Sequence, residues 1–413
     1  MDLKQLESLK PSLDRFVRDF EGCVKMQATR AHVMTYVCGQ LGDLPRKSVE
    51  PIALRAGVAP RTLQEFLSWH RWEADALRDV LQVRVAKRHA HPHAIGLVDE
   101  TGCAKKGDKT PGVQRQYCGS TGKNDNCVVT VHLGYVADDF HTLLDSALFL
   151  PEETWGQDRD RCKRAGIPDE MVYRPKWAIA LKLLEGALSR GVKLEWLCAD
   201  ELYGRVSAFR LGVQDLGVKY MVEIPHTHTG FSARSDSELA PRPVLRWAHG
   251  GRGWETFRVK STEKGWVVKR VRAIRFCPCE EGVAGDEQWL LVVRDVLDNS
   301  VKVFLSNAPS DTPLRTLLTV AFSRWHVERL FQEGKSEIGF DHFEGRTYQG
   351  LMRHLALSSL SLLFLAEQRK RLGPKKGALH RSPSSSSGAP RKSSSTRGSD
   401  RARDGATCST PST

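Results

Sequence analysis

Hydrophobic and polar residues follow different periods in different parts of the chain. Residues 1–90 place apolar positions at helical spacing and contain few strand-like runs, which predicts a helical region. From residue 94 the apolar runs become short, and "AIGLVDETG", "VQRQYCG" and "NCVVTVHLGYV" predict strands separated by turns rich in Gly, Lys and Asp. A helix is expected over residues 170–190, followed by the strand "KLEWLCADELYG", a short helix and the strand "VKYMVEIP".

Residues 225–305 form a second strand-rich stretch. Alternating runs such as "WVVKRVRAIRF" and "QWLLVVRDVL" predict strands, and four tryptophans lie in this stretch: Trp247, Trp254, Trp266 and Trp289. A connection of roughly 80 residues is too long for a simple loop, so it predicts an inserted β subdomain. Helical spacing resumes near Pro313 and continues to about residue 370.

The segment "PIALRAGVAPRTLQEFL", Pro51–Leu67, fits a helix-turn-helix pattern within the helical region. Ala53 would pack inside the first helix, Gly57 would open the turn, and Leu63 would anchor the second helix. A small residue and a glycine at these places allow two helices to meet closely. A plain helical hairpin is an equally good interpretation of this fragment.

The charge of the chain is uneven. The formal net charge is +13, but the nine basic and two acidic residues from Arg371 onward contribute +7 of it, which leaves +6 for residues 1–370. A basic protein favours a polyanionic partner. The Ser/Arg-rich stretch 371–413 has almost no large apolar residues and is expected to be disordered. It is either read-through or sequence from a shifted reading frame, or a real basic arm that contacts DNA.

The ten cysteines are scattered without paired spacing, and the polar start "MDLKQLESLKPSLDRF" does not resemble a signal peptide. A cytoplasmic chain with reduced thiols is therefore expected. No apolar run reaches about 18 residues, so no membrane span is predicted.

Two aspartates follow buried strands. Asp99 comes after Ile95–Val98, and Asp200 comes after Trp196–Ala199. A buried carboxylate costs desolvation energy unless something compensates it, and open α/β sheets bind ligands at this edge. If the two strands are neighbours, the acids converge and require a cation between them, for which Mg²⁺ is suited. Taken singly, an aspartate at a strand end is more often a turn or cap residue.

A third acid is expected in the helix "RWHVERLFQEGK", Arg324–Lys335. At about 100° per residue, Glu328 lies within about 40° of both ends of this segment. This arc borders an apolar stripe formed by Val320, Val327, Phe331 and Ile338. Glu333 and Glu337 fall at about 180° and 220° from Arg324, so both are expected to face outward. The alternative is a plain ion pair between Arg324 and Glu328.

Three carboxylates could hold two metal ions. Such a pair activates a water or a 3′-hydroxyl and stabilises the leaving oxygen when a phosphodiester is displaced. The order Asp99, Asp200, Glu328 along the chain, on two strands and a later helix, favours this chemistry over three unrelated structural acids.

Five motifs together resemble the DDE transposases of bacterial insertion sequences: "GLVDETGCAKKG", "GVQRQYCGSTGKNDNCVVTVHLGY", "FLPEETW", "WLCADELYG" and "RWHVERLFQEGKSEIGFDHFEGRTYQG". The resemblance covers roughly residues 10–365. It implies an α/β fold with a ribonuclease-H-like mixed sheet flanked by helices, an N-terminal helical domain and a β insertion before the last acid. It also implies that Asp99, Asp200 and Glu328 are the catalytic, metal-binding residues.

Around the third acid, these transposases carry a Tyr–Arg–Glu–Lys signature. Arg324, Glu328 and Lys335 match its spacing, whereas Ala321 stands where the tyrosine is expected, next to Phe322. In the resembling enzymes an aromatic residue of the insertion helps to handle the DNA end, and the four tryptophans are candidates for that role.

Six basic residues are candidate DNA contacts. Arg324 and Lys335 would hold phosphates beside the acids, and Lys123 would lie near them at a hairpin turn formed by "GSTGK". The others are Arg61, Lys105 and Lys106.

The resemblance implies the following organisation and activity. Residues 1–90 would bind DNA, 91–224 with 306–370 would form the catalytic core, 225–305 the insertion, and 371–413 the tail. The protein would cleave DNA at its element's ends and transfer the freed strands to target DNA, using two Mg²⁺ or Mn²⁺ ions. Its partners would be double-stranded DNA and further copies of itself, in the bacterial cytoplasm and at the nucleoid when bound.

Other functional classes have weaker support. "AIGLVDE" also resembles the acidic strand of P-loop ATPases, but "GSTGKN" is too short for a phosphate loop and follows that strand instead of preceding it. The Cys and His pairs in "CPC", "HPH" and "HTH" lack partners at zinc-site spacing and are expected to be loop residues. A DNA-binding regulator on an inactive core, or a nuclease relative that no longer transposes, remains the alternative function.

Overall fold

The computed structural model describes residues 8–232, 240–248, 252–262 and 265–373. The predicted tail therefore lies outside the described residues, except that its first residues complete the last helix, α13 (Tyr348–Leu372). In the described part of the chain, none of the helices is long and apolar enough to span a membrane. All nine cysteines described there are free thiols.

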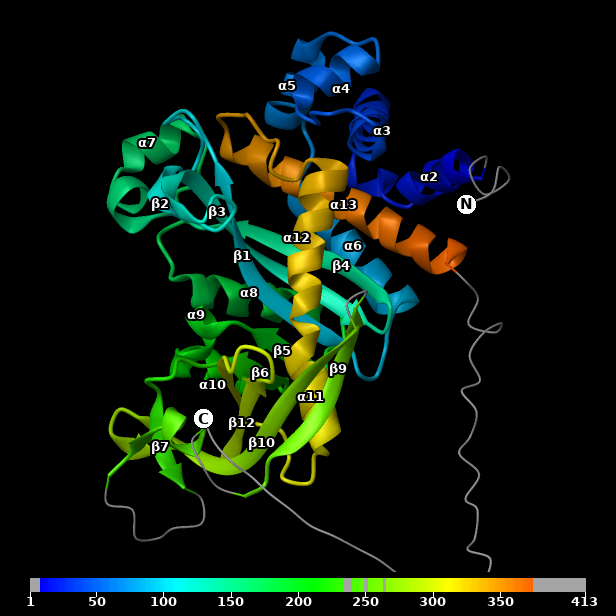
Figure 1. Cartoon of the computed structure of the whole chain (residues 1–413). Coiled ribbons are helices and arrows are strands. Elements are labelled where there is room, and N and C mark those ends of the chain that lie inside the picture. The colour runs from blue at the N-terminus through cyan, green and yellow to red at the C-terminus, as the bar shows by residue number, and fades with distance from the viewer. Residues whose placement is uncertain (1–7, 233–239, 249–251, 263–264, 374–413) are drawn as a thin grey trace, which may run out of the picture. The chain divides into compact units, whose positions relative to one another are not determined.

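Helices make up the first part of the described chain (Figure 1). They are α2 (Leu9–Arg18), the short 3-10 helix η1 (Glu21–Cys23), α3 (Gln27–Leu41), α4 (Val49–Arg55), α5 (Pro60–Ser68) and α6 (Ala74–Arg88). Within α4 and α5, Ala53 and Leu63 are fully buried, and Gly57 has a φ of 69°, a value that favours glycine. These are the packing roles predicted for the helix-turn-helix segment; its binding to DNA stays a prediction.

The core sheet is mixed. Its strands are β1 (Ile95–Ala104), β3 (Lys123–Ala137), β4 (Phe140–Leu148), β5 (Trp196–Ala199) and β6 (Lys219–Glu223). They lie in the order β4–β3–β1–β5–β6, with β1, β5 and β6 parallel and the β1–β3 and β3–β4 pairs antiparallel. A mixed sheet flanked by helices confirms the predicted α/β fold and is consistent with a ribonuclease-H-like core.

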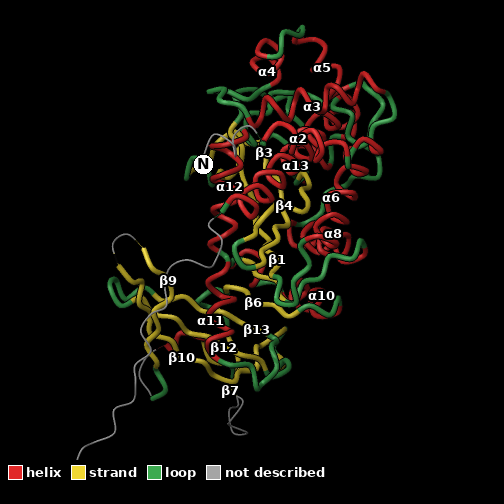
Figure 2. The backbone as a smooth tube through the Cα atoms, turned by 90° about the vertical axis from the view of Figure 1, so that its right-hand side faces the viewer, coloured by secondary structure: helices red, strands yellow, loops and turns green. Residues whose placement is uncertain are grey.

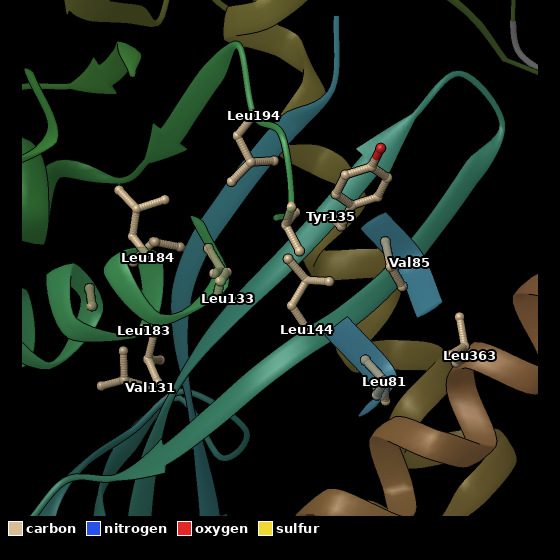
Figure 3. Packing of buried hydrophobic residues seen from close by; sticks show 14 of the residues in the cluster. Leu81, Val85, Val131, Leu133, Tyr135, Leu144, Leu183, Leu184, Leu194 and Leu363 are labelled. Atoms are coloured by element: carbon tan, nitrogen blue, oxygen red, sulfur yellow. The ribbon is translucent and has the colours of Figure 1, made fainter. Parts of the chain in front are cut away.

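Helices cover both faces of this sheet (Figure 2). On one face, Leu97 of β1 packs with residues of α11 (Leu314–Ser323) and α12 (Trp325–Ile338). On the other face, Val98 packs with α6, α8 (Lys176–Ser189) and α13. Figure 3 shows Leu183 of α8 and Leu81 of α6 over β3 and β4. Because side chains alternate along a strand, neighbouring residues of β1 face different helix layers.

Shorter elements connect these layers. They are β2 (Gln114–Cys118), the one-turn π-helix η2 (Glu152–Gly156), α7 (Arg159–Arg164), α9 (Glu201–Gly204) and α10 (Ser207–Asp215). The helix predicted over residues 170–190 begins only at Lys176, because Pro175 disfavours a helical conformation in the residue before it.

The strands of the predicted insertion continue the core sheet. They are β7 (Thr229–Ser232), β8 (Arg242–Pro243), β9 (Glu255–Thr262), β10 (Gly265–Glu280), β11 (Val283–Ala284), β12 (Gln288–Asp295) and β13 (Val301–Ser306), with the 3-10 helix η3 (Val244–Ala248) among them. The link to the core is the pairing of β13 with β6, where Leu305 lies opposite Val222. The insertion is thus attached to the core through main-chain hydrogen bonds.

Arg353 of α13 joins the last helix to the N-terminal helices. Its fully buried guanidinium donates to the carbonyl oxygens of Leu67 at 2.9 Å, His70 at 2.6 Å and Trp72. Burial lowers the pKa of Arg353 to about 10. Because the carbonyls at the end of a helix have no partners within it, this one side chain satisfies the end of α5 and the turn that follows.

Replacing Arg353 by methionine should leave these buried carbonyls without donors. We expect R353M to lower the free energy of unfolding by about 3 kcal/mol in urea titrations. R71M, at an exposed arginine of the same turn, is the matched control and should change it by less than about 0.5 kcal/mol. Equal effects of the two substitutions would contradict this role for Arg353.

Candidate active site

Asp99 and Asp200 lie beside each other in the sheet. Val98 pairs with Ala199 in the parallel β1–β5 ladder, and each aspartate is the next residue. Leu97 and Cys198, two residues before them, pack against the α11–α12 layer, so both aspartates point toward that layer. Asp99 is not at a strand end, as the sequence suggests, because β1 runs on to Ala104 along β3. It lies where the parallel neighbour of β1 ends.

Arg324 connects the first aspartate to the third predicted acid. It lies at the junction of α11 and α12, just before the first residue of α12. Its guanidinium lies 3.1 Å from a carboxylate oxygen of Asp99 and 3.4 Å from one of Glu328. Arg324 therefore binds acids of the site here, whereas the sequence suggests a phosphate contact.

Burial and like charge dominate the electrostatics. Burial first, and then the charge of Asp200, raise the pKa of Asp99 to about 7, although Arg324 acts in the opposite direction. Burial and the charge of Glu100 raise the pKa of Asp200. The Asp200 side chain also caps α9 by accepting a hydrogen bond of 3.0 Å from the Leu202 amide. The positive charge near the two aspartates is therefore too small to keep both of them ionised.

The helical-phase prediction is right for Glu337 but wrong for Glu333. The apolar stripe omitted Leu330, which is almost fully buried and lies at about 240° from Arg324. The buried side of α12 is therefore wider than predicted, but helical phase does not separate Glu333 from Glu337, which at about 220° lies nearer to Leu330. The side chain of Glu333 is only 19 % exposed because β4 and α13 contact it, whereas that of Glu328 is 68 % exposed. Glu328 reaches the site through Arg324.

Glu333 forms a charged cluster that ties α12 to α13 and β4. It accepts from Arg329 at 2.7 Å and from Arg369 at 2.8 Å, and it lies 3.2 Å from the buried His141. These hydrogen bonds outweigh the effect of burial and hold the pKa of Glu333 well below its ordinary value. No sequence pattern groups these residues, because they come from three elements that only the fold brings together.

The donor chemistry fits a divalent metal ion. Asp99 and Asp200 supply carboxylate oxygens, the ligands that Mg²⁺ and Mn²⁺ prefer. The raised pKa of Asp99 reflects a carboxyl group that a nearby cation would stabilise in its charged form. Within the described residues, no three His, Cys, Asp or Glu side chains are already arranged as a metal site. Glu328 would therefore have to change its position to join the two aspartates.

The other predicted DNA contacts are spread over the described chain. Lys335 lies near Cys103 and His132. Burial raises the pKa of Cys103 and lowers that of His132, and the charge of Lys335 opposes the first shift and adds to the second. Lys105 is not free for phosphate, because its ammonium group donates to the carbonyl oxygens of Asp341 and Phe343. Lys106 is exposed.

Lys123 and Arg61 lie at more remote places. Lys123 begins β3 after the predicted hairpin turn, but it is nine residues from His132, the partner of Asp99. That separation is about 30 Å along a strand, so the structure does not bring Lys123 to the acids. Arg61 is exposed on α5 and binds Glu65 at 2.7 Å.

The comparisons with known proteins agree with this geometry. Residues 19–268 match a family described as "DDE superfamily endonuclease". The chain belongs to this family. The matched range includes both aspartates and ends before Glu328. The family implies a requirement for a divalent metal ion and DNA as the substrate.

The chain is also similar to a protein that is named as a transposase. This endonuclease is 28% identical over 310 residues to a protein of Microchaete diplosiphon named "Probable transposase for insertion sequence element IS701", and the match covers 74% of each chain. Together the two comparisons confirm the resemblance to DDE transposases, support transposase function and do not favour the alternative of a DNA-binding regulator.

The raised pKa of Asp99 predicts a specific pH dependence in metal-free protein. Between the ordinary pKa of 3.8 and about 7, the folded chain keeps a proton that the unfolded chain loses, so this contribution to stability falls as pH rises. We expect the free energy of unfolding of D99N, relative to the parent, to increase by about 2 kcal/mol between about pH 5 and about pH 7.5. Urea titrations with a chelator measure it.

D108N, at an exposed aspartate, is the control, and its free energy of unfolding should differ from that of the parent by the same amount at every pH. If the difference in free energy of unfolding between D99N and the parent is equally constant with pH, the assigned environment of Asp99 is contradicted.

The Glu333 cluster predicts a difference between two glutamates of one helix. E333Q should lower the free energy of unfolding by about 2 kcal/mol, because Arg369 and Arg329 lose their common partner. E337Q, on the exposed side of α12, should change it by less than about 0.5 kcal/mol. Thermal or urea unfolding distinguishes the two, and equally small effects of both substitutions would support the original phase prediction.

Proposed function

We propose that this endonuclease is a transposase that cleaves DNA at the ends of its own element and joins the freed 3′-hydroxyls to target DNA. The observation that carries the proposal is the placement of Asp99 and Asp200 side by side, on the sheet face covered by the helix that bears Glu328. The alternative of an inactive core with a regulatory role offers no reason to keep two like charges together in a buried place.

Asp99, Asp200 and Glu328 are proposed to hold two Mg²⁺ or Mn²⁺ ions. When bound, such ions activate the attacking oxygen and stabilise the leaving oxygen of the phosphodiester. The protein's part is to hold the two aspartates in register and to present Glu328 from α12. Arg324, which now lies between Asp99 and Glu328, would be released toward a DNA phosphate once the acids are otherwise neutralised.

Several surfaces are proposed to contact DNA. The α4–α5 segment with Arg61 would bind the terminal inverted repeats, and Lys106, Lys123 and Lys335 would contact phosphates. Of the four insertion tryptophans, Trp266 is the strongest candidate for stacking on a base, because it is 56 % exposed and lies beside Arg258.

The remaining tryptophans are more strongly engaged by the protein. Trp247 packs edge-on against Phe276, and the Trp289 indole donates to the Pro309 carbonyl at 2.9 Å. Trp254 lies between the guanidinium groups of Arg270 and Arg294.

The proposed reaction also bears on assembly and location. Two element ends must be cut and joined together, so we propose that the chain acts as an oligomer on DNA, in the bacterial cytoplasm and at the nucleoid when bound. Residues 1–90, 91–224 with 306–370, and 225–305 are proposed to serve as the DNA-binding, catalytic and inserted parts.

The test is cleavage of DNA that carries the element's own ends, in Mg²⁺. D99N and D200N should each lower the cleavage rate at least about 10³-fold while binding to the same DNA changes less than about threefold. E328Q should behave likewise, whereas E337Q, nine residues later on the same helix, should cleave at nearly the parent rate. Cleavage by D200N at the parent rate would refute the proposed site.

A further inference from the structure

A hydrogen bond joins the two segments that carry the aspartates, immediately beyond the last pair of their strands. The β1–β5 ladder ends at Val98 and Ala199, and no further pair of these two strands follows. Past that point, the Tyr203 hydroxyl donates to a carboxylate oxygen of Glu100 at 2.8 Å. Glu100 directly follows Asp99, and Tyr203 is the third residue after Asp200.

This bond is well placed to oppose the repulsion of the aspartates. Two like charges lie where the main-chain ladder has just ended, so the segments would tend to separate there. Glu100 follows Asp99 on the strand and therefore points to the opposite face of the sheet, toward α8 and α9. The bond therefore holds the two segments together without occupying the side of the sheet on which the aspartates lie.

A counter-charge accompanies Glu100. The ammonium group of Lys176, the first residue of α8, donates to its other carboxylate oxygen at 2.7 Å. Both carboxylate oxygens of Glu100 thus accept hydrogen bonds, one from Lys176 of α8 and one from Tyr203 of α9. This pairing reduces the repulsion that a third carboxylate would add beside Asp99 and Asp200.

Tyr203 itself has little freedom to move. Its side chain is fully buried, and its ring lies 5.6 Å from that of Phe209. The next residue, Gly204, has its Cα so close to β6 that a Cβ there would collide with the carbonyl oxygen of Glu223. The hydroxyl is therefore held at a fixed place relative to Asp200, and it fixes Glu100 in turn.

We propose that Tyr203 and Glu100 are positioning residues that set the separation of Asp99 and Asp200 for metal binding. Lys176 serves as the counter-charge. The inference rests on the proposed function, since it concerns the same metal site. Neither residue contacts the reacting atoms; both act through the aspartates.

The experiment compares two buried tyrosines. Y203F removes the hydroxyl that donates a hydrogen bond to Glu100. Y220F, on β6, is the control and removes the hydroxyl that donates to Gln288 at 2.6 Å. We measure Mn²⁺ binding to the full chain from the electron paramagnetic resonance signal of free Mn²⁺, with thermal unfolding in parallel. Y203F should bind Mn²⁺ about five- to tenfold more weakly than the parent, and Y220F within twofold of it.

The cleavage reaction supplies a second readout. Y203F should need about five- to tenfold more Mn²⁺ for half-maximal cleavage. At saturating metal it should approach the parent rate, because it has lost a positioning group but keeps all of the proposed metal ligands. A merely structural role would lower the melting temperature and leave the metal dependence unchanged.

A second pair of variants keeps the test decisive if Y203F folds poorly. E100Q and E100A both lose the ion pair with Lys176, but only glutamine keeps an oxygen that accepts from Tyr203. E100Q should therefore bind Mn²⁺ at least about threefold more tightly than E100A. Equal binding by E100Q and E100A would overturn the inference.

The outcomes separate the two proposals. A parent protein that binds Mn²⁺ through Asp99 and Asp200, together with a Y203F variant that binds it equally well, would overturn only the positioning role. A parent that neither binds Mn²⁺ nor cleaves DNA would overturn the proposed function and the positioning role with it.

Discussion

Two carboxylates of like charge lie side by side in a buried part of the sheet, and much of the surrounding structure opposes their repulsion. Asp99 and Asp200 are brought together by the pairing of β1 with β5. On one face Arg324 binds Asp99, and on the other Tyr203 and Lys176 hold Glu100. The site is therefore kept in register from both faces of one sheet.

The helix α12 is fixed along its whole length. Arg324 ties its start to β1, and Glu333 ties its middle to α13 and β4. At its end, Lys47 donates to the carbonyl oxygens of Glu337 and of Gln40 in α3. The helix that presents Glu328 is thus held by the sheet, by the last helix and by the N-terminal helices. Binding of DNA to the N-terminal helices would act on a segment that is directly connected to α12.

The sequence predicted the strands, because these depend on local periodicity. It predicted the convergence of the aspartates only on the condition that the two strands are neighbours, and the structure meets that condition by pairing β1 with β5. It could not reveal that β1 continues past Asp99, since that extension depends on pairing with β3. It also missed the role of Glu333, because the partners that cover this side chain, His141 and Arg369, lie on β4 and α13, far from α12 in the sequence. Tyr203 and Glu100 were overlooked because their bond joins residues that are 103 positions apart.

The reach of the last helix has a consequence for synthesis of the chain. Arg353 completes the end of α5, and Tyr36 and Gln40 of α3 bond to His354 and Ser358 of α13, each across 318 residues. The helices made first therefore acquire their final partners only after α13 has left the ribosome. The proposed DNA-binding part and the helix that bears Glu328 therefore become complete at nearly the same moment. A truncated chain that lacks α13 would thus leave buried polar groups of α3 and α5 without their partners, in the part of the chain that is proposed to bind DNA.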